Sequence, residues 1–182
     1  MKYLYITIFL LLISVQSYSQ ESTKNWIFSI GCGTQISGIK SEDFIRSNVS
    51  PAFVLNIGNW VTPEVAIQIG YKGFYFHTIA DNYKHHYNFL YGEVLFNIKE
   101  LINRKEIVND KWNIIIHPGA GYFYNNTYNR PNICANFGII NSYRVIDQLE
   151  IFLDVSAIMG WDIYQGNDDI LPSCVIGLSY SF

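Results

Sequence analysis

Four side chains of this sequence have the types needed for a hydrolytic site: His117, Ser156, Ser173 and Asp154. In such a site the imidazole removes the serine proton and the carboxylate orients the imidazole, so the groups must converge within hydrogen-bonding distance. The strand faces and heights that we assign to these residues do not bring a nucleophile, a base and an acid together. We therefore predict no catalytic residues and expect that the protein is not an enzyme.

Metal and cofactor chemistry has little support either. His77, His85 and His86 flank one predicted loop, and two or three imidazoles can bind zinc, copper or nickel. However, no carboxylate or thiol stands at ligand spacing beside them. The cysteines form an odd, sparse set without metal-ligand spacing, which we interpret as small apolar fillers: Cys32, Cys134 and Cys174. We predict no metal site and no cofactor.

A third set of polar residues is better explained by position than by catalysis. These residues share the inward face of predicted strands, and we assign them to a lumen polar network: Gln68, Lys72, Glu93, His117, Arg144, Glu150 and Asp154. Because an unpaired buried charge is costly, these groups must pair or stay hydrated. Two interpretations remain open, a structural plug of salt bridges and a narrow pore for small solutes or ions.

The elements that position these residues are predicted from alternating side-chain character, since successive side chains of a strand point to opposite faces. About eight segments of roughly ten residues alternate in this way, namely 26–35, 51–60, 64–76, 84–97, 112–124, 134–145, 149–161 and 171–182. The sequence therefore predicts an all-β fold, an antiparallel up-and-down transmembrane β-barrel of about eight strands. Pro118 falls inside the fifth segment and predicts a bulge or a locally unpaired position there.

The polarity of the two faces favours a barrel in a membrane over a soluble one. In the last segment one face is apolar, whereas the other carries mostly serine and glycine, with Val175 as an exception. Small polar residues make a poor soluble exterior but suit a tight lumen. The high aromatic content of 16% and the low charged content of 15% agree with an apolar surface that faces lipid.

The first residues predict export. Lys2 precedes an apolar run from Leu4 to Val15, and the small residues around Ser19 suggest cleavage before Gln20. We predict a signal peptide at 1–19 and an outer-membrane barrel domain at 20–182. The whole chain of 182 residues has 12 Lys and Arg against 15 Asp and Glu, a net charge of −3, so it offers no basic surface for nucleic acid.

Connection lengths and aromatic residues predict an orientation. Short links near 60–64 and 145–149 are expected in the periplasm, together with a long charged link at 98–111, and longer loops at 36–50, 77–83, 125–133 and 161–171 are expected outside the cell. Aromatic rings favour the headgroup level of a bilayer. We predict an aromatic girdle at the two interfaces, formed by Trp26, Trp60, Trp112, Tyr143 and Phe182 on the inner side and by Tyr75, Tyr122 and Trp161 on the outer side.

The last strand carries a more specific resemblance. Its alternate residues Ile176, Leu178, Tyr180 and Phe182 resemble the C-terminal assembly signal of outer-membrane proteins. With the stretch from Phe137 to Asp154, the mature chain resembles the eight-stranded OmpA-like and OmpW-like barrels. Gln20 after a short signal peptide and the Tyr- and Asn-rich segments resemble the form found in Bacteroidetes.

The resemblance implies a location in the cell outer membrane. It implies contacts with outer-membrane lipids and lipopolysaccharide, and recognition by the barrel-assembly machinery. We expect no peptidoglycan-binding domain, a non-enzymatic structural or interaction role, and an extracellular or periplasmic protein partner. The alternatives are a narrow pore and a lipid A-modifying enzyme. The His-x-Ser arrangement of the deacylases is absent, because Pro118 and Gly119 follow His117.

Overall fold

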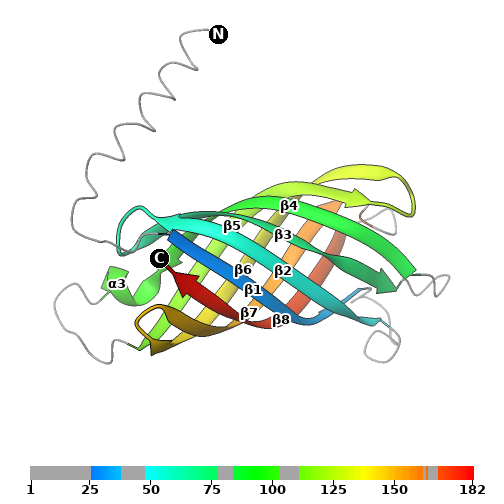
Figure 1. The fold of residues 1–182 in the computed structure, drawn as a ribbon. Coiled ribbons are helices and arrows are strands. Elements are labelled where there is room, and N and C mark those ends of the chain that lie inside the picture. The colour runs from blue at the N-terminus through cyan, green and yellow to red at the C-terminus, as the bar shows by residue number, and fades with distance from the viewer. Residues whose placement is uncertain (1–25, 38–47, 78–83, 103–110, 162, 164–167) are drawn as a thin grey trace, which may run out of the picture.

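The computed structural model describes residues 26–37, 48–77, 84–102, 111–161, 163 and 168–182, without the side chains of 161, 168 and 169. It is a closed antiparallel barrel in which each strand pairs with the next and β1 pairs with β8 (Figure 1). The elements in chain order are β1 (Trp26–Ile36), β2 (Val49–Trp60), β3 (Val65–His77), β4 (Lys84–Asn97), α3 (Ile98–Ile102), β5 (Trp112–Asn125), β6 (Arg130–Ile146), β7 (Leu149–Trp161) and β8 (Asp168–Ser181). The predicted fold and strand number are confirmed. The predicted signal peptide at 1–19 lies outside the described residues.

The barrel closes where its first and last strands meet. β1 and β8 pair from Ile27 opposite Ser181 to Gln35 opposite Ser173. The seam continues to Phe182, whose N–H donates to the carbonyl of Trp26 at 2.9 Å. Closure satisfies the backbone donors and acceptors that an open sheet would leave at its edges, a condition that the hydrocarbon core of a bilayer imposes.

Side chains alternate between the two faces of the barrel wall. In β7 the outward residues Ile151, Leu153 and Val155 are about half exposed, whereas Phe152 and Asp154 between them are buried. The same period of two runs through β1, β2 and β4. An exposed aliphatic row around a partly polar interior is the polarity of a membrane barrel, not of a soluble one.

The two ends of the barrel differ in their connections. One end, which we call the turn end, has the short β2–β3 connection at 61–64, the β6–β7 connection at 147–148, α3 and the last residue. We call the opposite end the loop end. In Figure 1 α3 and the C-terminus lie together at the left, which is the turn end. No helix within the described segments is long and apolar enough to cross a membrane.

At the loop end, the predicted loop at 125–133 is wrong. β5 and β6 stay paired up to Asn125 opposite Arg130, so the connection is only residues 126–129 and Pro131 lies within β6. The Asn125 side-chain oxygen accepts hydrogen bonds from the N–H groups of Thr127 and Tyr128. Asn129 has a φ of 54°, a left-handed conformation that asparagine tolerates. This turn chemistry extends the hairpin.

Pro118 produces no bulge. The β4–β5 register is the same on both sides of it, with Glu93 opposite Gly119 and Phe96 opposite Ile116. The stretch between these pairs is fully described, and in it Val94 and Leu95 of β4 are not paired with β5. On the other side of β5, Pro118 is paired with Phe137 of β6. A proline has no N–H to donate, so the ladder opens toward one neighbour without changing register.

Candidate functional site: the barrel lumen

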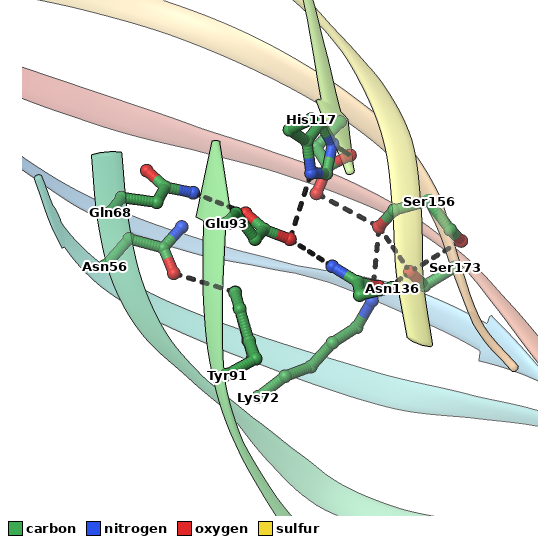
Figure 2. Close-up of polar contacts among 10 residues, drawn as sticks. Asn56, Gln68, Lys72, Tyr91, Glu93, His117, Asn136, Ser156 and Ser173 are labelled. Carbon is green, nitrogen blue, oxygen red and sulfur yellow. Dashed lines mark hydrogen bonds and ion pairs between the residues drawn. The ribbon is translucent and has the colours of Figure 1, made fainter. Parts of the chain in front are cut away.

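The middle of the lumen is occupied by an ionic cluster centred on His117 (Figure 2). Its Nδ1 lies 3.1 Å from a Glu93 oxygen and its Nε2 lies 3.1 Å from an Asp154 oxygen. Glu93 also accepts hydrogen bonds from Gln68 at 2.7 Å and from Asn136. The three strands β4, β5 and β7 thus meet through one imidazole, and Glu93 receives several donors, as a buried carboxylate requires.

Lys72 reaches the same cluster from β3. Its Nζ is 3.2 Å from the Ser156 hydroxyl and also bonds that of Ser173, and the side chain is only 2% exposed. Ser156 in turn donates to Asp154 at 3.1 Å. An imidazole that donates from both nitrogens is a cation. With His117 in that form, two positive groups balance the two carboxylates, which is the condition under which buried charges are tolerated.

The predicted network is therefore brought together in part. Gln68, Lys72, Glu93, His117 and Asp154 form one buried group, which we call the central cluster together with Asn136, Ser156 and Ser173. The other two predicted members, Arg144 and Glu150, stand apart. They are cross-strand partners near the turn end, 3.5 Å apart and partly exposed. Their separation follows from their places at the end of β6 and the beginning of β7.

Sequence reasoning missed the small polar members of the central cluster. The sequence suggests Ser156 and Ser173 only as candidate nucleophiles and suggests no role for Asn136. All three occupy inward positions of their strands, since each is buried between two neighbours that are more exposed. Reading every inward position, not only the charged ones, would have found them.

Beyond the central cluster, the loop half of the lumen is filled with apolar and aromatic side chains. Tyr87 and Phe123 stack at 4.9 Å, and Phe89 and Tyr91 stack at 5.0 Å. We call the whole group the aromatic core, which consists of Phe76, Tyr87, Phe89, Tyr91, Phe123, Cys134, Ile158, Ile163 and Leu171. The prediction of a polar lumen is wrong for this half, because the inward row of β4 above Glu93 is mainly aromatic.

The turn half of the lumen is hollow. A cavity of about 580 Å³ runs from the 61–64 and 147–148 turns to the central cluster, where Glu93, His117 and Asp154 form its floor. We call this cavity the vestibule. Its wall carries Ser29, Asn56, Asn97, Asn113, Ser142, Ser179 and Ser181, with apolar patches of Ile27, Leu95, Ile115, Ile140 and Phe152. Among the described residues of the aromatic core, Tyr91 borders the vestibule and the others do not line it.

The candidate hydrolytic residues are close together but are not arranged as a triad. Both His117 nitrogens face carboxylates, so neither is free to take a serine proton. Ser156 bonds Asp154, not His117. The other arrangement that could activate a serine pairs it with a lysine, and Lys72 does contact Ser156 and Ser173. However, none of these three is among the described residues that line the vestibule, so a substrate in that cavity does not reach them.

The loop-end histidines pack with aromatic rings. His85 stacks on Phe76 at 5.5 Å, and His86 lies edge-on to Tyr75 at 5.8 Å. His77 contacts Tyr75 and bonds Ser50. Across the described residues there is no group of three or more His, Cys, Asp or Glu side chains that could hold a metal ion.

The residues predicted to form the aromatic girdle lie on different faces. Trp26, Trp112, Tyr143 and Phe182 point outward at the turn end, and Trp112 contacts Tyr143 edge-on at 5.1 Å. At the loop end Tyr122 is exposed, Tyr75 is half-buried, and the Trp161 side chain lies outside the described residues.

Trp60 does not belong to the outward ring. As an even-numbered residue of β2 it faces the lumen with Asn56 and Gly58. There it lines the vestibule and packs against the buried cluster of Ile27, Ala66, Leu95 and Ile115. A shift of one position reverses the face of a strand residue, and the end of a strand is where such an assignment is weakest.

The C-terminal strand presents its apolar residues to the outside. Ile176, Leu178, Tyr180 and Phe182 are each about half exposed, and Tyr180 stacks on Phe182 at 6.3 Å. This arrangement is compatible with the predicted assembly signal, which itself stays a prediction.

A closed eight-stranded barrel with an apolar exterior defines the class of small transmembrane β-barrels, and the solved structures that the chain resembles belong to that class. Neisserial surface protein A superposes with a TM-score of 0.61 at 7% identity, over 86% of this chain and 97% of that one. The N-terminal β-barrel domain of Pseudomonas aeruginosa OprF gives 0.57 at 11% identity, over 88% and 100%. The attachment invasion locus protein Ail of Yersinia pestis, in complex with the heparin analogue sucrose octasulfate, gives 0.56 at 11% identity, over 88% and 100%.

The resemblance to these barrels is found by comparing structures and not by comparing sequences. No protein-family model matches the chain, and no curated protein matches it. At identities of 7 to 11% the solved structures show a common fold, that of small outer-membrane barrels.

Proposed function

We propose that this protein is an integral outer-membrane barrel with a structural or interaction role, whose lumen is a plug and not a conduit. The observation that carries the proposal is the filling of the lumen above the vestibule. The central cluster spans the barrel at mid-height, and the aromatic core fills the loop half with side chains that are at most 5% exposed. A solute on this path would have to displace both layers.

The energetics of the two layers favour a plug over a gated pore. Separating His117 from Glu93 and Asp154 would leave charges unpaired in a space with little water, which is costly. Rearranged salt bridges alone would still leave the stacked rings of Tyr87 and Phe123 in the way. A conducting state would thus require a change in the aromatic core as well as in the ion pairs.

The proposal also includes a non-enzymatic role. A lipid-modifying enzyme must present its nucleophile to the outer leaflet, but Ser156 and Ser173 point into the lumen and the barrel wall separates them from lipid. Mass spectrometry of lipid A from cells with and without the protein tests this part. We expect an identical acyl pattern, and a lost or added acyl chain would contradict it.

The interaction part of the role is assigned to the loop end. There the outward faces of β3 and β4 and the β5–β6 connection carry polar groups, with Tyr71 donating to Asn88 at 2.7 Å and Asn88 donating to Asn126 at 3.1 Å. Lys84 Nζ lies 4.9 Å from the centre of the Tyr75 ring. Cationic and amphipathic groups at the rim suit the headgroup level, where lipopolysaccharide is the expected contact.

The deciding experiment combines location with conductance. Cell fractionation should place the protein in the outer membrane, and a gel should show faster migration without boiling than after it. Planar-bilayer recordings of the purified barrel should show insertion without ion current. Steady channel openings in the unmodified protein would refute the plug, and recovery in a soluble fraction would refute the membrane barrel.

A further inference from the structure

The vestibule has the size and shape of a ligand site. Its volume of about 580 Å³ falls within the range of roughly 300 to 1,000 Å³ of small-molecule pockets. The mouth lies between the turns at the turn end, since Thr62, Pro63 and Asp147 are among its lining residues. The floor is the central cluster. A pocket with one described mouth and a hydrogen-bonded floor holds a solute instead of passing it on.

The wall is rich in neutral hydrogen-bonding groups. Hydroxyl groups come from β1 and β8, where Ser29 donates to Ser179 at 2.9 Å, and carboxamides come from β4 and β5, where Asn97 donates to Asn113 at 3.4 Å. Hydroxyls donate and accept, and carboxamides do both through separate atoms. Such a wall matches a ligand that itself carries hydroxyl and amide groups.

The charges of the pocket are largely balanced within the protein. Glu93 and Asp154 in the floor face His117, and Lys72 lies behind them among the cluster serines. Arg144 on the wall pairs with Glu150. Among the charged residues that line the vestibule, Glu100 and Asp147 near the mouth have no ion pair to another described residue. Deeper in the pocket each described charge faces an opposite one, so a neutral ligand fits this interior better than a polyvalent ion, which would find an unpaired countercharge only at the mouth.

The side chain of Trp60 adds an aromatic surface to the polar wall of the vestibule. Trp60 faces inward at the turn end and lines the vestibule beside the patch of Ile27, Leu95 and Ile115. A planar indole next to polar groups offers an apolar surface together with a polar edge. The apolar C–H face of a sugar ring requires that kind of partner, and a few convergent polar groups then fix its orientation.

We propose that the vestibule is a binding site for a neutral, N-acetylated saccharide of about disaccharide size, which enters from the turn end. Trp60 provides the stacking surface, the serine and asparagine side chains bind the hydroxyl and acetamido groups, and the central cluster sets the depth. The proposal goes beyond the plug and relies on it only for the closed floor. Binding is measured on the barrel in micelles, so a result that refuted the plug would leave this test intact.

The experiment uses N,N′-diacetylchitobiose as the probe and Trp60 as the reporter. In the barrel with Trp26→Phe, Trp112→Phe and Trp161→Phe, Trp60 is the remaining tryptophan. Titration into the refolded protein should produce a saturable change in its emission. The absence of a saturable change at millimolar probe would overturn the proposal. Spermidine that binds as tightly as the saccharide would also overturn it, since the pocket would then be a cation site.

Two variants of β8 locate the binding. Ser179→Phe adds a ring to the vestibule wall, and Leu178→Phe adds the same ring one residue away on the lipid-facing side. We expect at least tenfold weaker binding for the first and a change of less than twofold for the second. Equal effects of the two variants would overturn the site.

A milder variant covers the case in which Ser179→Phe does not fold. Asn113→Leu removes a wall carboxamide at nearly constant size and should weaken binding severalfold, with the heat-dependent gel shift of the folded barrel retained. Unchanged affinity of a folded Asn113→Leu barrel would contradict the proposed amide contact and the saccharide site with it.

Discussion

The two halves of the lumen are built from the same strands and yet have opposite interiors. The turn half is a hollow with hydroxyl, amide and apolar patches, whereas the loop half is filled by the buried aromatic core. β4 passes through both, and its inward row changes character at Glu93, with Tyr87, Phe89 and Tyr91 on the loop side and Asn97 on the turn side. The barrel architecture therefore does not decide what the lumen contains. The residues at inward positions decide it.

Glycine shows how closely the central region is packed. A Cβ added to Gly70 would lie 2.1 Å from the Asn56 oxygen and 2.5 Å from the Tyr91 ring. Those two side chains are themselves joined, with Tyr91 donating to Asn56 at 2.7 Å. The missing side chain at Gly70 thus allows Tyr91 to cross the lumen between the aromatic core and the vestibule. The boundary between the two halves depends on one small residue as well as on the charges.

Lys72 should be the most sensitive position in the barrel, because it belongs to neither half and compensates charge between them. Lys72→Met keeps the aliphatic stem and removes the charge, which leaves the carboxylates in excess. We expect a loss of about 4 kcal/mol in the free energy of unfolding, in the range for leaving a buried charge uncompensated. Urea titration of the refolded barrel measures it. Lys84→Met, at the exposed start of the next strand, is the control, and equal losses would show that Lys72 is not a buried charge.

Phe123→Ala tests whether the loop half is a packed core. Phe123 is fully buried and contacts both Tyr87 and Phe89. We expect a loss of about 3 kcal/mol, at the lower end for Phe-to-Ala in a core because the neighbouring rings can tilt into the space. Phe137→Ala, whose side chain points outward, is the matched control. A loss no greater than in this control would mean that the loop half is loosely filled.

Most of the fold could be predicted because strand faces are local information. The outward row of β7 and the inward serines of β8 follow from a period of two, and both are as predicted. The interior was harder, because it depends on which inward residues from different strands share a height. Arg144 illustrates this, since its face is inward but its height excludes it from the central cluster.

Two other differences also concern information that sequence patterns do not carry. The sequence predicts an outward Trp60 because the residue stands at a strand end, where a shift of one position changes the face. The aromatic core is not predicted, because the polar residues of each inward row alone do not show the rings that lie between them. Phe76 and Phe89 are on the same row as the polar groups. The Bacteroidetes-type resemblance and the signal peptide remain predictions.

Tyr87→Phe separates the polar contact of the aromatic core from its packing. The Tyr87 hydroxyl donates to the Gln35 side chain, and both residues are fully buried. Removing the hydroxyl keeps the ring stack with Phe123 but leaves the Gln35 oxygen without that donor. We expect a loss of about 1 to 2 kcal/mol, the cost of an unsatisfied buried group. Gln35→Leu also removes the bond that Gln35 donates to the Tyr75 carbonyl at 2.8 Å, so the double variant Tyr87→Phe/Gln35→Leu is compared with Gln35→Leu alone. Urea titration of the three variants should show that Tyr87→Phe costs less in the Gln35→Leu background, and equal costs in the two backgrounds would contradict the explanation.

Ser179→Ala should have the smallest effect, which makes it the sharpest contrast with Tyr87→Phe. Each variant deletes one hydroxyl from a hydrogen bond inside the same barrel, since Ser29 donates to Ser179 at 2.9 Å. The difference is that both serines line the vestibule, where water can take the place of the lost partner. We therefore expect a change below about 0.5 kcal/mol in the free energy of unfolding, within the spread of substitutions at hydrated positions. A loss as large as that of Tyr87→Phe would mean that the vestibule contains no more water than the aromatic core. The two halves of the lumen would then differ in side-chain type and not in hydration.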